Sequence, residues 1–163
     1  MGEERRRGSS NYPFALLILT VLVAAFQILI LGRFVVEALL LSFLVVYKGL
    51  GGVWVFLGHF FSSDRVAEFI GWPRGNPFQK EVAFTNLSIG LLGLLCFWFR
   101  GDFWTATAVG SSIFSFGAAY VHIHDMHENK NYAPGNTGPV LYVSDILVPT
   151  AILILLVVYS LGY

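Results

Sequence analysis

The sequence predicts an all-α fold: a polytopic membrane helical bundle of about five transmembrane helices, with the N-terminus inside and the C-terminus outside. Hydrophobic residues make up 56% of the 163 residues and charged residues only 12%, whereas soluble domains carry about 25% charge. Five apolar runs alternate with short polar stretches. We therefore expect a multi-pass protein of the cell membrane, with the lipid bilayer as its main partner.

Charge and cysteine content argue against a nucleic-acid-binding protein and against a fold held by internal disulfides. The formal net charge is zero, so the chain lacks the basic excess typical of proteins that bind nucleic acid. Its single cysteine, Cys96, lies inside an apolar run and allows no internal disulfide.

We divide the chain into two parts: a basic cytoplasmic tail over residues 1–12 and a single transmembrane helical domain over residues 13–163. The first apolar run, 13–32, is long enough to cross a bilayer as a helix. Pro13 suits a helix start because its missing N–H has no partner there. Gln27 is the only strongly polar side chain in this run, which we interpret as a plain anchor helix.

The second run, 34–61, is longer than a bilayer requires and carries Lys48 near its middle. Two interpretations are open: an intramembrane lysine that faces the bundle, or a helix broken by the glycines that follow, which lets Lys48 reach an interface. Glu37, Lys48 and His59 are spaced eleven residues apart, about three helical turns, so we expect them on one face.

A polar connection over 62–78 contains Pro73, Gly75 and Pro77 and leads to the third run, 78–99. This run has two stripes at helical spacing. One stripe is polar and consists of Glu81, Thr85 and Ser88. The second is Asn86, Gly90 and Gly93, and its small residues favour close packing on a neighbouring helix.

The fourth run begins near residue 103 and ends in 120–127, which holds three of the four histidines and Asp125. Its polar residues share a stripe that either lines a cavity or bonds only to the preceding helical turn: Thr107, Ser111, Ser115 and His122. Turn-forming residues fill 128–139, where we expect a loop.

The fifth run, 140–161, carries Asp145 in its first turns and Pro149 four residues later. A proline clashes with the carbonyl four residues before it, so the Asp145 backbone and side chain are both candidates for binding. The alternative is a kink beside a carboxylate that the helix dipole favours.

Cationic residues concentrate in the tail and in the 62–80 and 128–139 connections, so the positive-inside rule assigns these segments to the cytoplasm. Alternation of the five runs then brings distant ionisable residues to the cytoplasmic half of the bundle. We expect a polar pocket there that consists of His59, Glu81, His122, His124 and Asp145.

Histidine and carboxylate groups of this kind can bind a divalent metal such as zinc or iron. Glu81, His122 and Asp145 are the candidate catalytic residues of a membrane-embedded hydrolase or oxidoreductase, in which a metal-bound water attacks the substrate. Whether the protein is an enzyme stays open. The alternatives are a small proton- or ion-linked transporter that uses Lys48, and an accessory subunit of a homo-oligomer or a larger membrane complex.

One block of sequence is the most distinctive: residues 69–82, which begin Phe-Ile-Gly-Trp-Pro-Arg-Gly-Asn-Pro, followed by Asn86 and Gly90. Together with the stretches 112–122, 134–138 and 145–149, it resembles a family of small uncharacterised prokaryotic integral membrane proteins, catalogued as domain of unknown function 6790. The resemblance implies a several-span helical membrane protein and no particular activity.

Overall fold

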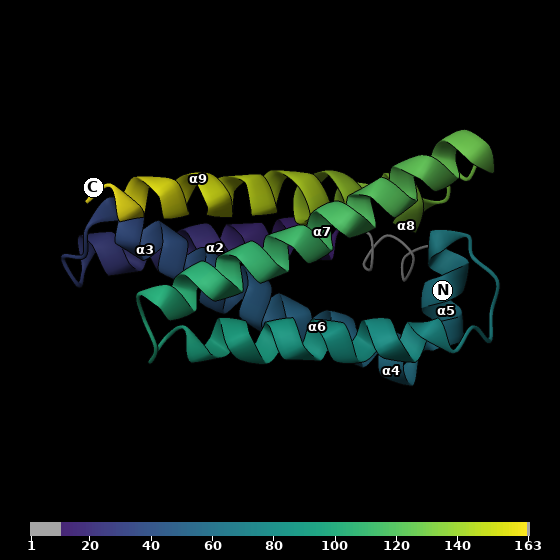
Figure 1. Ribbon diagram of the computed structural model, residues 1–163, viewed down its shortest axis with the longest axis horizontal. Helices are drawn as coiled ribbons and strands as arrows, with labels where there is room; N and C mark the ends of the chain where they lie inside the picture. Colours follow the sequence, from purple (N-terminus) through teal and green to yellow (C-terminus); the bar gives the residue numbers. More distant parts are fainter. Residues whose placement is uncertain (1–10, 163) are drawn as a thin grey trace.

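The computed structural model of the protein describes residues 11–162, and every regular element within them is helical (Figure 1). In chain order these are α2 (Tyr12–Leu29), α3 (Val35–Ser42), η1 (Phe43–Leu50), α4 (Gly51–Phe61), α5 (Ser63–Ile70), α6 (Phe78–Leu95), α7 (Asp102–Glu128), α8 (Pro134–Thr137), η2 (Val140–Leu147) and α9 (Val148–Ser160). The segments η1 and η2 are π-helical, with wider turns than the α-helices around them. The predicted tail lies mostly outside the described residues.

Four helices in the described chain are long and apolar enough to cross a membrane: Tyr12–Leu29, Val35–Phe61, Asp102–Glu128 and Pro134–Ser160. The third predicted run forms α6, which spans 18 residues and is not among these four, because the polar Gln79, Lys80 and Glu81 occupy its first turn. The all-α bundle is confirmed, and the protein has the helices of a membrane protein.

Successive long helices run in alternating directions along the bundle (Figure 1). The end of α4, the start of α6 and the end of α7 meet at one end, together with the short helices α5 and α8. We call this the polar end. The turns between α2 and α3 and between α6 and α7 lie at the opposite end, as does the C-terminal end of α9.

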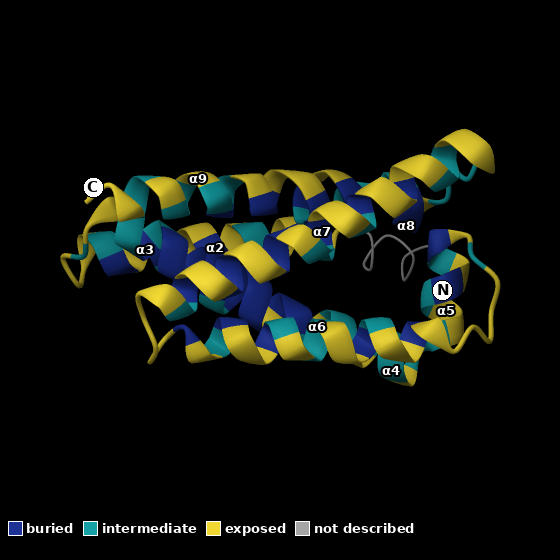
Figure 2. Ribbon diagram, in the orientation of Figure 1, coloured by how far each residue is buried: buried dark blue, intermediate teal, exposed yellow. Residues whose placement is uncertain are grey.

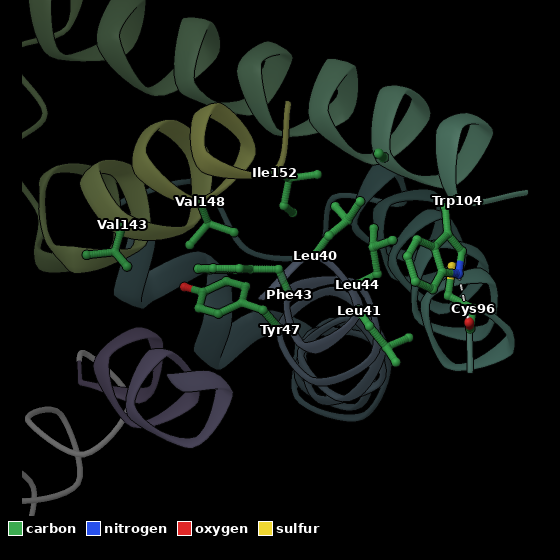
Figure 3. Packing of buried hydrophobic residues seen from close by; sticks show 11 residues of the cluster. Leu40, Leu41, Phe43, Leu44, Tyr47, Cys96, Trp104, Val143, Val148 and Ile152 are labelled. Carbon is green, nitrogen blue, oxygen red and sulfur yellow. Dashed lines mark hydrogen bonds between the residues drawn. The ribbon is translucent and has the colours of Figure 1, made fainter. Parts of the chain in front are cut away.

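The hydrophobic core lies where α3, η1, α7, η2 and α9 meet (Figure 3). Trp104 is fully buried there and donates its indole N–H to the backbone carbonyl of Cys96 over 2.8 Å. Much of the outer surface is also apolar: large side chains such as Ile18, Phe97 and Ile154 are exposed along the bundle (Figure 2). Such an outer surface suits contact with lipid.

A close contact joins α6 to the continuous helix formed by η1 and α4, and glycine residues on both helices allow it. A Cβ on Gly52 would lie 2.7 Å from the Asn86 carbonyl and 2.8 Å from Gly90, and a Cβ on Gly93 would lie 2.6 Å from backbone atoms of Gly49 and Leu44. The predicted stripe of Asn86, Gly90 and Gly93 therefore packs on a neighbour that is itself glycine-rich.

Polar contacts also hold the other helices. Gln27 is buried and donates to the Ser42 hydroxyl over 2.8 Å, so α2 is more than the predicted plain anchor. At the end opposite the polar end, the Glu37 carboxylate pairs with Arg33 and Arg100. Glu37, Lys48 and His59 thus lie in separate surroundings, since eleven residues of helix separate successive members by about 16 Å along the axis.

We predict that Gly52→Ala and Gly93→Ala destabilise the protein, since each added methyl group meets backbone atoms that cannot move alone. Overpacking of this kind costs about 1–3 kcal/mol. Equilibrium unfolding in detergent micelles measures the change.

Gly110→Ala and Gly117→Ala are the matched controls, because a Cβ at either position meets nothing within 4 Å. Both should leave stability unchanged or raise it slightly through helix propensity. Equal losses in all four variants would contradict the glycine contact.

Candidate functional site

At the polar end, His122 is held by the segment that follows α7. The imidazole is buried, and its Nδ1–H donates to the Asn136 side-chain oxygen over 2.7 Å. The Asn136 amide donates in return to the backbone carbonyls of Asn131 and His122. Asn136 belongs to α8, a single helical turn that begins at Pro134, inside the stretch predicted to be loop throughout. Proline suits the first position of a helix.

A second contact joins the polar end to the Gly71-Trp72-Pro73 motif. The Trp72 indole stacks on the His122 ring at 5.4 Å between centroids, and its N–H donates to the Asp125 carboxylate over 2.8 Å. That carboxylate also accepts from the side-chain amides of Asn129 and Asn131. The connection after α5, the end of α7 and the segment 129–131 therefore form one hydrogen-bonded network.

Two glycines permit this network to close. Gly71 has φ +85° and ends α5, and a Cβ there would lie 2.5 Å from the Asn131 side chain. A Cβ on Gly135 would lie 2.5 Å from the Phe69 ring. Both positions lie within the sequence blocks singled out above, so these blocks correspond to the junction between α5, α8 and the end of α7.

A different polar group lies inside the bundle, halfway along the long helices. Lys48 on η1 is only 7% exposed, and its ammonium donates to the Ser115 hydroxyl of α7 over 2.8 Å. The helix continues through Gly51 and Gly52 without a break. Of the two interpretations of Lys48, the structure therefore supports the one in which it faces the bundle.

Asp145 on η2 is 9% exposed, so the bundle interior holds a buried carboxyl group besides Lys48. The two groups do not form a direct ion pair within 4.0 Å. Beside them, the Tyr47 and Ser144 hydroxyls share a hydrogen bond of 2.9 Å that links η1 to η2. Both buried charges therefore lie on π-helical segments, which often occur at functional sites.

The five residues predicted to form one metal pocket do not come together as one metal-binding group. Within residues 11–162 no group of three or more His, Cys, Asp or Glu side chains lies close enough to hold a metal ion. His122 belongs to the Asn136 network, Asp145 lies deeper beside Lys48, and His124 is exposed near the Tyr120 ring. The described residues therefore give no support to the predicted metal centre at His59, Glu81, His122, His124 and Asp145.

The remaining two members of the predicted pocket lie on the α4 and α6 side. Glu81 is exposed, and its stripe partners Thr85 and Ser88 bond only to the preceding helical turn. The glycine face of α6 packs inward, and the Glu81 stripe is five residues, or about 140°, away from it. His59 lines a separate cavity with Gln79.

Five residues of the polar network were not among the predicted site residues: Trp72, Asp125, Asn129, Asn131 and Asn136. Trp72 belongs to the most distinctive sequence block, and that was the signal for it. The three asparagines lie in a turn-forming stretch, where side-chain amides are common for local reasons. Nothing in their spacing indicated a bond to a histidine.

The family comparison covers nearly the whole chain: residues 10–161 match the model of a family of unknown function, DUF6790. The chain belongs to this family. No curated protein and no solved structure matches it. The family therefore supports the resemblance seen in the sequence and supplies no activity for the polar groups described above.

We predict that Asn136→Ala destabilises the protein by about 1–3 kcal/mol, because it leaves the buried His122 N–H without its acceptor. Unfolding in detergent micelles measures the loss. Asn129→Ala is the control: it removes one exposed hydrogen bond to Asp125 and should change stability by no more than about 0.5 kcal/mol. A smaller loss at Asn136 than at Asn129 would show that the His122 contact contributes little.

Proposed function

We propose that this protein is a small proton-linked transporter of the cell membrane, in which Lys48, Ser115 and Asp145 form the proton-carrying group. The observation that carries the proposal is the placement of Lys48 and Asp145, both buried halfway along helices of membrane-spanning length. A charged side chain at the centre of a bilayer is costly, and such residues typically mark ion pathways or proton relays.

The chemistry of the three groups fits proton transfer. A lysine ammonium can release a proton and a carboxylate can accept one, and the transfer leaves both groups neutral in an apolar interior. The Ser115 hydroxyl accepts from the ammonium and can donate to a further group. Because Lys48 and Asp145 are not in direct contact, the transfer requires an intervening hydroxyl or water.

The surrounding structure supports movement at this position. In π-helical turns the backbone hydrogen bonds run from residue i to i+5, and η1 and η2 carry the two charges on adjacent helices linked by the Tyr47–Ser144 hydrogen bond. Pro149 follows η2 in the first turn of α9, where its missing N–H weakens the preceding turn.

The alternative of a metal-dependent hydrolase or oxidoreductase has less support. Its candidate catalytic residues, Glu81, His122 and Asp145, lie on an exposed helix face, in the polar network and in the bundle interior. A metal-bound water would need several of them within coordination distance of one ion. The transporter proposal instead uses groups that are already buried and neighbouring. The N-terminus and the polar end then face the cytoplasm, as the positive-inside rule suggests.

The test is proton flux in liposomes that contain the purified protein and an internal pH-sensitive dye. Under an imposed pH gradient with charge compensation, we expect the wild type to transport protons. Lys48→Met and Asp145→Asn should fall to the rate of protein-free liposomes, because each variant removes a titrating group. Ser115→Ala should be slowed.

Glu128→Gln and Lys130→Gln are the controls, since they change exposed charges and should transport at the wild-type rate. Circular dichroism confirms that each variant is helical. As a second measurement, infrared difference spectra on acidification should show a protonated carboxylic band that Asp145→Asn removes. Wild-type flux in both Lys48→Met and Asp145→Asn would falsify the proposal.

A further inference from the structure

A second polar site lies at the polar end, between the end of α4 and the start of α6. It is a cavity of about 230 Å³, partly open to the outside. His59 and Gln79 supply its buried polar atoms, while Trp72, Phe78 and Val82 form apolar and aromatic walls. None of these residues belongs to the Lys48 group, so the following inference does not rest on the proposed transport.

Two enclosed polar atoms in this cavity have no hydrogen-bond partner: His59 Nδ1 and Gln79 Oε1. Gln79 is only 7% exposed. The imidazole and the amide lie close to each other, but no hydrogen bond of normal geometry joins them. Leaving a buried polar group unpaired costs about 1–3 kcal/mol, and most such groups in native proteins have a partner. A guest molecule that bonds to both atoms removes this cost.

The two atoms define the chemistry of the guest. The Gln79 oxygen can only accept, so the guest must donate a hydrogen bond to it. The His59 nitrogen can donate when it is protonated. One hydroxyl group satisfies both, because it donates to Gln79 and accepts from His59. No lining residue carries a carboxylate, an ammonium or a guanidinium group, so a neutral guest is favoured.

The size and the walls of the cavity distinguish the guest from water. One water occupies about 30 Å³, far less than the cavity. Besides His59 and Gln79, the lining offers the exposed Asn76 amide as a polar partner, whereas Trp72, Phe78 and Val82 present apolar and aromatic surface. We propose that this cavity binds a neutral, membrane-soluble ring compound with a hydroxyl group, of the phenol class. Its ring packs against the aromatic walls and its hydroxyl bridges His59 and Gln79.

The test uses phenol as the probe and anisole as its matched control, because anisole has a similar ring but no hydroxyl donor. The full-length protein is labelled with 5-fluorotryptophan and observed by fluorine NMR in detergent micelles. Trp72→Phe assigns the signal of Trp72. We expect phenol to shift this signal saturably and anisole to give no saturable shift, while Trp54 and Trp98, which are exposed, report unspecific partitioning.

His59→Phe and Gln79→Leu should each abolish the saturable phenol shift, whereas His127→Phe, at an exposed position, should keep it. The comparison of phenol with anisole in the wild type does not depend on the folding of any variant. Equal shifts with both compounds overturn the proposal, as does the absence of a saturable shift, which means that water alone fills the cavity. Proton flux is a separate readout, so failure of either proposal leaves the other intact.

Discussion

An ammonium group inside a bilayer must find its partners within the protein, because the hydrocarbon around it offers none. Lys48 meets this constraint by bonding to Ser115. Asp145 follows Ser144, whose hydroxyl is hydrogen-bonded to that of Tyr47, the residue before Lys48. The helices that carry Lys48, Ser115 and Asp145 must therefore meet at one depth. The glycines on η1, α4 and α6 allow α6 to pack closely against the continuous helix formed by η1 and α4. The charged interior and the glycine contact together determine the order of the helices.

The polar end follows a different principle. There, side chains from the connection after α5, the end of α7 and the segment 129–136 bond to one another, and His122 and Asp125 are held by asparagine and tryptophan side chains. Such a network fixes the ends of α5, α7 and α8 relative to each other and explains why the distinctive sequence blocks contain glycine, tryptophan and asparagine. The His122 imidazole and the Asp125 carboxylate therefore serve as hydrogen-bonding groups that hold this end of the bundle together.

Much of the fold could be predicted from residue patterns. Long apolar runs gave the helices within a few residues, and the small-residue spacing of Gly90 and Gly93 indicated the packed face of α6. The depth of Asp145 could not be predicted, because the turn-forming residues before it hide a helix start at Pro134. The direction of Glu81 could not be predicted either, since spacing defines two faces of a helix without saying which is buried. The partner of His122 could not be predicted either, because the turn-forming residues around Asn136 predict a loop and not the helical turn α8.

The π-helical segment η1 also affects whether the continuous helix Val35–Phe61 can tolerate the deletion of a residue. A π-helical turn is an α-helical turn with one additional residue. Loss of one residue from 43–50 can therefore be absorbed by a return to ordinary α-helical bonding, with the flanking helices keeping their faces. A deletion within α6 has no such reserve, because it rotates every later residue by about 100° and separates Gly93 from Gly49. Tolerance of deletions is thus unevenly distributed between two helices that pack side by side.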